Sequence, residues 1–213
     1  LRLVNTSVGR TAAQSLGLPA PAPLKRLKRA DQPFIEGEVL IGAANGGKAI
    51  ATLGSILGAS AATLHHASES NRLKGPADLR ALYDFFHPTI KKLGSNARVL
   101  VIGQNPASCR KAPQAAAQRA LEGFVRSVGK EIGKKGSTAN LLWMAPGAEK
   151  QLDSSVRFFL SARSAYVSGQ VVKVGKGNAA PATNPVAPLT GKVALVTGAS
   201  RGIGAAISET LAR

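Results

Sequence analysis

The sequence predicts an α/β fold in which a parallel sheet is covered by helices on both faces. Three observations lead to this prediction. The strand-like runs are short and apolar, as in Arg98–Ile102 (RVLVI). Helical repeats of apolar residues separate these runs, and this alternation is typical of a parallel sheet buried on both faces. The chain of 213 residues, with Cys109 as its one cysteine, is long enough to bury a core without disulfides.

The elements follow in order along residues 38–176. Each strand is a short apolar run that ends near a glycine or a polar turn. Each helix shows apolar residues at spacings of three and four. Within the second helix Pro88 should kink or split the run, because proline lacks the N–H that a helix interior needs. We predict strands at 39–41, 61–64, 98–102, 138–144 and 170–174, and helices at 48–57, 76–93, 114–132 and 153–160.

The composition divides the chain into four parts. Residues 1–37 form a proline-spotted lead segment with a basic run at Lys25, Arg26, Lys28 and Arg29. Residues 38–176 carry the regular α/β pattern. Residues 177–190 (GNAAPATNPVAPLT) form a proline-rich linker that should be extended and semi-rigid. Residues 191–213 begin a second α/β domain, with a strand at Lys192–Thr197 followed by a helix.

The charge of the chain predicts an anionic partner. Lys and Arg number 28 against 11 Asp and Glu, a formal net charge of +17. Such a charge attracts nucleic acid, a membrane surface, a phosphorylated cofactor or an acidic protein. Aromatic residues make up 4% of the chain, which argues against nucleic-acid binding by base stacking. A solvated basic surface without a dedicated partner is the alternative.

The sequence carries neither a membrane span nor a secretory signal. No apolar run approaches the roughly 20 residues that a transmembrane helix needs. The first ten residues lack the apolar core of a signal peptide. We therefore expect a soluble, cytoplasmic protein. The chain does not begin with Met, so we expect its natural N-terminus to lie before Leu1.

The strongest chemical motif is the glycine-rich turn Thr197–Gly204 (TGASRGIG). Gly198 permits a sharp exit from the preceding strand, Gly202 lets backbone N–H groups approach a pyrophosphate, and Gly204 permits close packing. The following helix supplies free N–H donors and a partial positive charge at its N-terminus. Arg201 adds a full positive charge. The turn therefore predicts a dinucleotide-binding site.

Two further candidates are weaker. Gly42–Lys48 (GAANGGK) also joins a predicted strand to a helix, but its glycine spacing does not match a dinucleotide fingerprint. Lys48 there would hold a phosphate or simply be solvated. Cys109 lies beside Arg110 and Lys111, which would lower its pKa, yet no base is evident nearby. We expect an inert thiol.

The residues Leu189–Gly204 (LTGKVALVTGASRGIG) closely resemble the opening of a short-chain dehydrogenase/reductase. Within that family they look most like the 3-oxoacyl-[acyl-carrier-protein] reductases of fatty-acid synthesis. In that family the arginine of this turn contacts the 2′-phosphate of NADP, so the resemblance implies NADP(H) as cofactor. The implied cofactor-binding residues are Gly198, Ser200, Arg201, Gly202, Ile203 and Gly204.

The middle segment resembles the same family in a decayed form. Arg119–Gly133 looks like the helix that carries the catalytic Tyr-x-x-x-Lys, and Phe158–Val171 looks like the last helix and strand. This alignment puts Gln114 at the Tyr position and Gln118 at the Lys position. An amide neither donates a proton as a phenol does nor carries charge. The resemblance thus implies a Rossmann-like domain without hydride chemistry.

This layout resembles the high-molecular-weight 3-oxoacyl-[acyl-carrier-protein] reductases, which carry a flavodoxin-like domain before the active one. The resemblance implies an NADPH-dependent reduction of a 3-ketoacyl thioester to a 3-hydroxyacyl thioester. It also implies that the catalytic Ser, Tyr, Lys and Asn are not in these 213 residues, so that this stretch alone is inactive. Acyl carrier protein or an acyl-CoA thioester would be the partner, and we expect a homo-oligomer. The alternatives are a structural or assembly domain, and a flavin- or nucleotide-binding module at Gly42–Lys48.

Overall fold

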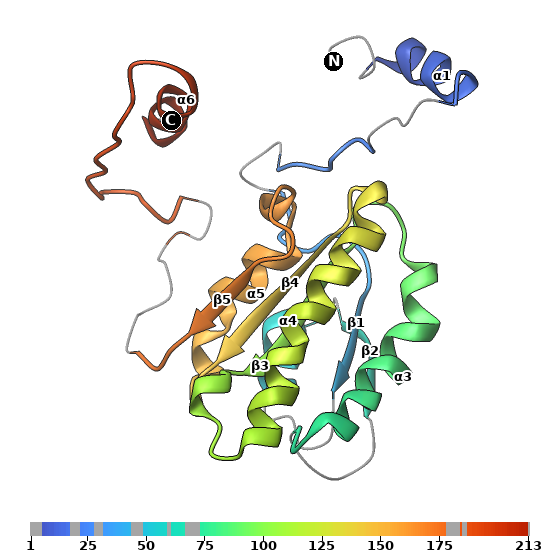
Figure 1. The fold of residues 1–213 in the computed structure, drawn as a ribbon. Coiled ribbons are helices and arrows are strands. Elements are labelled where there is room, and N and C mark those ends of the chain that lie inside the picture. The colour runs from blue at the N-terminus through green and yellow to red at the C-terminus, as the bar shows by residue number, and fades with distance from the viewer. Residues whose placement is uncertain are drawn as a thin grey trace. The chain divides into compact units, whose positions relative to one another are not determined.

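The computed structural model describes residues 6–17, 22–27, 32–43, 49–58, 61–66, 73–177, 184 and 187–212 (Figure 1). By its internal contacts the chain divides into two compact units, Leu1–Ala179 and Ala180–Arg213. The first unit contains every strand of the described residues and the helices α1 to α5. The second contains helix α6 (Gly202–Ala212).

The predicted parallel sheet is present as two hydrogen-bonded ladders. Strands β1 (Val39–Ala43) and β2 (Ala61–His66) pair in parallel. Strands β3 (Arg98–Gln104), β4 (Thr138–Met144) and β5 (Val171–Val174) form a second parallel sheet in the order β3-β4-β5. The central strand β4 is buried from Thr138 to Trp143, as expected of a strand with neighbours on both edges.

Helices cover both faces of the β3-β4-β5 sheet, as the sequence predicts (Figure 1). Helix α4 (Ala112–Ile132) packs on one face, against alternate residues such as Val99 and Leu141. Helices α2 (Ala49–Leu57) and α5 (Asp153–Leu160) pack on the other face, with Leu142. Ile41 of β1 belongs to this second cluster, so the two ladders share a core.

Helix α4 is the longest element because its sequence satisfies several helix preferences at once. Pro113 lies in the first turn, where its missing N–H costs nothing. Apolar residues at spacings of three and four make one buried stripe, and each fully buried Leu or Val contributes about 1.5–3 kcal/mol. Gly136, in the left-handed region at φ 70°, follows the closing 3-10 helix η6 (Gly133–Lys135). Among the described helices none is both long and apolar enough to cross a bilayer.

The predicted helix at 76–93 is divided into three pieces. A 3-10 turn, η3 (Pro76–Leu79), leads into α3 (Arg80–Thr89), and α3 gives way to another 3-10 turn, η4 (Ile90–Lys92). The α-helix continues through Pro88 and ends one residue later. Because Pro88 has no N–H to donate, the regular α-helical bonding is weakened where the helix ends.

Part of the lead segment packs against the amino-terminal end of the sheet. Asn96, in the turn before β3, adopts a left-handed backbone at φ 61°. Its side-chain amide binds an extended stretch of the lead segment on both sides. Oδ1 accepts the backbone N–H of Lys25 at 2.8 Å, and Nδ2 donates to the carbonyl of Pro23 at 3.1 Å. Helix α1 (Ser7–Ser15) begins after Thr6, whose hydroxyl accepts the N–H of Gly9 at 3.1 Å.

The predicted strand at Lys192–Thr197 is wrong for this chain. Residues 192–196 pair with no strand among the described residues. Val193 is 102% exposed and Leu195 is 94% exposed. A backbone segment becomes a strand by pairing its N–H and C=O groups with a neighbouring strand, and a run that is apolar on both faces also needs cover over both faces. The second unit offers none within its described residues.

Candidate functional site

The glycine-rich turn of the second unit has the backbone that its sequence suggests. Residues 197–200 form a turn, and α6 begins at Gly202. Gly198 and Gly202 both adopt φ 65°, in the left-handed region that disfavours side chains. The turn therefore requires glycine at these two positions for conformational reasons.

Gly204 is required for a different reason. A Cβ atom built on Gly204 would collide with the carbonyl oxygen of Gly198 and lie 3.0 Å from the backbone nitrogen of Ala199. The first turn of α6 thus packs directly on the backbone of the preceding turn. Sequence reasoning placed this close approach between the helix and a strand, but here the neighbour is the turn itself.

This arrangement leaves polar groups available to an anion. The first N–H groups of a helix have no intrahelical acceptor and carry a partial positive charge. Arg201, Gly202 and Ile203 are exposed at this end of α6, and Ser200 is exposed just before it. The six predicted cofactor-binding residues therefore lie together on one short segment. Whether they bind a nucleotide remains a prediction.

A cluster of amides lies in the first unit, where β3 ends and α4 begins. Gln118 of α4 is 4% exposed, and its Oε1 accepts the backbone N–H of Gln104 at 2.8 Å. Gln114, one turn earlier, donates from Nε2 to Oε1 of Gln104 at 3.2 Å. Gln104 in turn donates to the hydroxyl of Ser108 at 3.3 Å. The structure thus brings Gln114 and Gln118 together around the end of β3.

Gly103 makes this contact between strand and helix possible. A Cβ atom at Gly103 would lie 2.7 Å from Oε1 of Gln118 and would collide with Cδ1 of Leu121. Sequence reasoning singled out Gln114 and Gln118 but missed the part that Gln104 plays. The available signal was a glycine followed by a polar residue at the carboxyl end of a buried strand, where sites of parallel sheets form.

The chemistry of this cluster is limited to hydrogen bonding. Its hydrogen-bonding groups are carboxamides, backbone groups and the Ser108 hydroxyl, and none of these titrates near neutral pH. A group that transfers a proton during a reaction needs a pKa near the working pH. The three glutamines therefore hold the strand end and the helix together without supplying an acid or a base.

The basic run of the lead segment is partly engaged within the first unit. Lys25 forms an ion pair with Glu36, and hydrogen bonds from Lys25 and Gln32 hold the pKa of Glu36 below its usual range. The Arg26 guanidinium lies 4.7 Å from the ring centroid of Tyr166. Lys28 and Arg29 lie outside the described residues.

The described residues give no support to the other candidates. Most of the Gly42–Lys48 turn lies outside the described residues, and a Cβ atom at Gly42 would collide with the ring of Phe85. Burial raises the pKa of the Cys109 thiol, opposite to the effect expected from Arg110 and Lys111. Within the described ranges no group of three or more His, Cys, Asp or Glu side chains is arranged to hold a metal.

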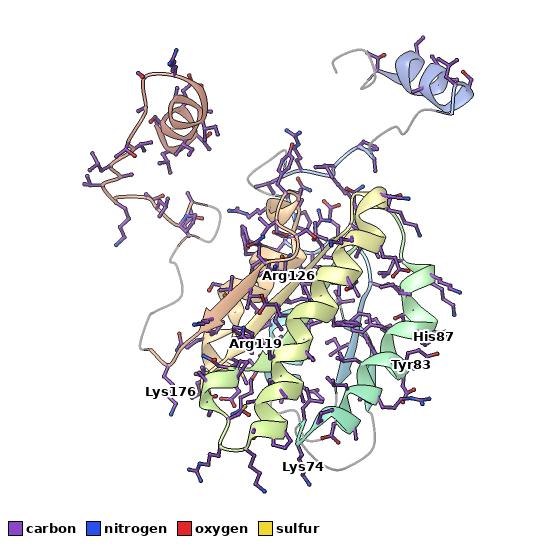
Figure 2. The ribbon with its side chains drawn as sticks, viewed as in Figure 1. Lys74, Tyr83, His87, Arg119, Arg126 and Lys176 are labelled. Carbon is purple, nitrogen blue, oxygen red and sulfur yellow. The ribbon has the colours of Figure 1, made fainter. Side chains whose placement is uncertain are left out.

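His87 and Tyr83 make an exposed aromatic pair on α3. Their ring centroids lie 4.7 Å apart and the rings are stacked (Figure 2). The Arg80 guanidinium lies 5.2 Å from the centroid of the Tyr83 ring and binds Asp84 at 2.7 Å. The His87 imidazole thus stacks on Tyr83, a neighbour on its own helix.

Parts of the chain are similar to solved structures. No protein-family model and no curated protein matches the chain. Among solved structures, a short-chain dehydrogenase/reductase from Serratia marcescens aligns at 18% identity and TM-score 0.43, over 48% of this chain and 52% of its own. A blue fluorescent protein from a metagenomic library, in complex with NADPH, aligns at 20% identity and TM-score 0.41, over 48% and 53%. A dehydrogenase/reductase from Sinorhizobium meliloti aligns at 18% identity and TM-score 0.42, over 55% and 63%.

These likenesses are too low to assign a family. All three TM-scores are below 0.45 and no identity exceeds 20%. The aligned part of each solved structure is 52–63% of its length. The parallel β3-β4-β5 sheet between helices shows the α/β architecture without these comparisons.

Proposed function

We propose that the Thr197–Gly204 turn binds the phosphates of NADP(H) and that the chain is part of a short-chain reductase. The observation that carries this proposal is the match between the turn's glycines and the turn's geometry. Gly198 and Gly202 adopt positive φ, and Gly204 touches the backbone of Gly198. A tight glycine turn that opens a helix is the arrangement on which a pyrophosphate rests in dinucleotide-binding proteins.

Arg201 gives the proposed site its preference for NADP(H) over NAD(H). Its guanidinium is always charged and presents several donors in a fixed fork, which suits a phosphate better than a ribose hydroxyl. Arg201 is exposed and directly precedes α6, whose first N–H groups are free. The sequence resemblance of Leu189–Gly204 to the short-chain reductases supports the same assignment.

The proposed reaction is hydride transfer from NADPH to the 3-keto group of an acyl thioester. This substrate class rests on the resemblance to the 3-oxoacyl-[acyl-carrier-protein] reductases and on the excess of basic residues. The formal net charge of +17 would attract acidic acyl carrier protein or the phosphates of an acyl-CoA. A cytoplasmic homo-oligomer is the expected form of such an enzyme.

The first unit has a structural role in this proposal. The buried hydrogen bond from Gln104 to Gln118 supports that role, because the positions matched to the catalytic Tyr and Lys hold amides that pack the strand end against α4. This unit would support the reductase domain or its assembly. We expect the 213 residues alone to reduce no thioester, because nothing in the matched positions can donate the proton.

The test is an assay of the protein as it occurs in its natural source. The protein is captured with an antibody against the first unit, and its intact mass and NADPH-dependent reduction of acetoacetyl-CoA are measured. We expect the source protein to reduce acetoacetyl-CoA and the 213-residue chain to leave it unreduced. In the source protein, Arg201→Gln should lower the rate of reduction more with NADPH than with NADH. A source protein that leaves acetoacetyl-CoA unreduced would contradict the proposed activity.

A matched variant tests the structural role of the first unit. In the 213-residue chain, Gln114→Tyr combined with Gln118→Lys restores the two residue types of the reductase motif. We expect no oxidation of NADPH from this variant, because no nucleotide turn lies beside these positions in the described part of the unit. Measurable oxidation, with the circular dichroism of the parent retained, would show that the unit is a reductase domain.

A further inference from the structure

We propose that five lysines at the ends of two neighbouring helical runs form a docking surface for an acidic protein. This surface, here named the lysine edge, consists of Lys91, Lys92, Lys130, Lys134 and Lys135, all exposed. It belongs to the first unit and does not depend on nucleotide binding by the second. A test of the lysine edge is therefore independent of the proposed reductase activity.

Hydrogen bonds between two turns bring the five lysines together. The lysine edge has two members at the end of η4 and two at the end of η6. The Lys135 ammonium donates to the carbonyl of Leu93, directly after η4, at 3.0 Å. The backbone N–H of Asn96 donates to the carbonyl of Lys135 at 2.9 Å. Lys130 lies four residues before Lys134, and residues at this spacing share one side of a helix.

The partial negative charges of the two helix ends offset only part of the positive charge of the five lysines. A helix C-terminus carries roughly half a negative charge, so the two ends offset about one positive charge. Glu131, which is exposed, offsets one more. Five lysines minus these two leave an excess of about three charges. Within the described residues, none of the five lysines takes part in an ion pair. Bringing an anionic partner to such a cluster relieves its self-repulsion.

The surroundings of the lysine edge favour a protein over a membrane. Across the described residues of η4, α4 and η6, no large apolar side chain is exposed. A surface that binds lipid stably combines its basic residues with apolar ones that enter the bilayer. Within these described ranges, the lysine edge has the basic residues without large exposed apolar residues beside them on η4, α4 or η6.

The same surroundings argue against nucleic acid. Base stacking needs free aromatic faces, but the rings of Tyr83 and Tyr166 are already covered, by His87 and by Arg26. Phosphates are bound preferentially at helix N-termini, where N–H donors point outward. Both helical runs present their C-termini here. Carboxylates of an acidic helix or loop pair with lysines as point charges, and they need neither free aromatic faces nor helix N-termini.

The test measures binding of fluorescein-labelled poly-L-glutamate to the full chain by anisotropy, at about 150 mM salt, where only close charges are felt. Lys91→Glu with Lys134→Glu reverses two charges of the lysine edge. Lys150→Glu with Lys176→Glu is the matched control, because both side chains are exposed and the net charge changes equally. Lys176 lies just after β5 (Figure 2).

We expect the edge variant to bind about tenfold more weakly and the control to stay within about twofold of the parent. Lys91→Gln with Lys134→Gln removes the two charges without reversing them, and we expect it to weaken binding about threefold. This variant replaces the reversed one if the reversed one does not fold. Equal losses in edge and control variants, or no binding by the parent, would overturn the proposal. Tighter binding of short duplex DNA or of anionic phosphatidylglycerol vesicles, lost in the edge variant, would overturn the choice of partner.

Discussion

The backbone N–H of Gln104, at the end of β3, donates a 2.8 Å hydrogen bond to the buried Oε1 of Gln118 on α4. This bond ties the end of the strand to the helix that covers it. In a parallel α/β sheet the carboxyl ends of the strands are where catalytic groups usually stand. In this unit a neutral amide occupies that place and is used for packing.

Removing the acceptor should destabilise the first unit. Gln118→Leu keeps the size of the side chain but takes the acceptor away from the half-buried Gln104 N–H, which costs about 1–3 kcal/mol if the group is left without a partner. We expect this decrease in the free energy of unfolding, measured by urea denaturation. Gln114→Leu is the control, because Gln114 is only half-buried and bonds a side chain that can turn elsewhere. An equal loss in both variants would show that the backbone bond has no special role.

Two glycines near α4 should respond to alanine with opposite signs. At Gly103 the new methyl would collide with Leu121 and crowd Gln118, and such overpacking costs about 1–3 kcal/mol. At Gly123, inside α4, the methyl meets no atom within 4 Å, and alanine favours a helix over glycine by about 0.5–1 kcal/mol. We expect Gly103→Ala to lower the melting temperature and Gly123→Ala to raise it. Two changes of the same sign would contradict the close packing at Gly103.

The lead segment should loosen when Asn96 loses its side chain. Asn96→Gly keeps the left-handed backbone without strain and removes only the amide that binds Lys25 and Pro23. We expect hydrogen exchange at the Lys25 amide to accelerate about fivefold, which corresponds to the roughly 1 kcal/mol of a net hydrogen bond. Unchanged exchange at Lys25 would mean that other contacts hold this segment.

Cys109 should react slowly with thiol reagents near neutral pH. Burial raises the pKa of this thiol, so a smaller fraction is thiolate than in a free cysteine. We expect alkylation by iodoacetamide to be slower than for glutathione near pH 7, with the midpoint of its pH dependence shifted upward. Alkylation faster than that of glutathione would mean that the charges of Arg110 and Lys111 lower the pKa of Cys109 by more than burial raises it.

Much of the first unit could be predicted because its pattern is local. The apolar run at 98–102 lies within β3, the run at 138–144 coincides with β4, and the stripe at 114–132 lies within α4. The division of 76–93 near Pro88 follows from one missing N–H. Each of these features depends on residues a few positions apart.

The rest depends on partners that no local pattern reveals. The run at 192–197 is mainly apolar and β-branched, as in a buried strand, yet it lacks a neighbour to pair with among the described residues. The place of Gln104 depends on α4, which follows it after a turn, and the pKa of Cys109 depends on burial rather than on its charged neighbours. The glycine turn could be recognised because a positive φ at Gly198 and Gly202 leaves so few residue types.

The most direct test of the proposed function is a titration of the isotope-labelled chain with NADPH, followed by NMR. We predict shifts of the backbone amides of residues 198–204, and a larger loss of binding for NADPH than for NADH in Arg201→Gln. Shifts confined to the first unit, around Gly42 or Gln104, with none in residues 198–204, would contradict the account.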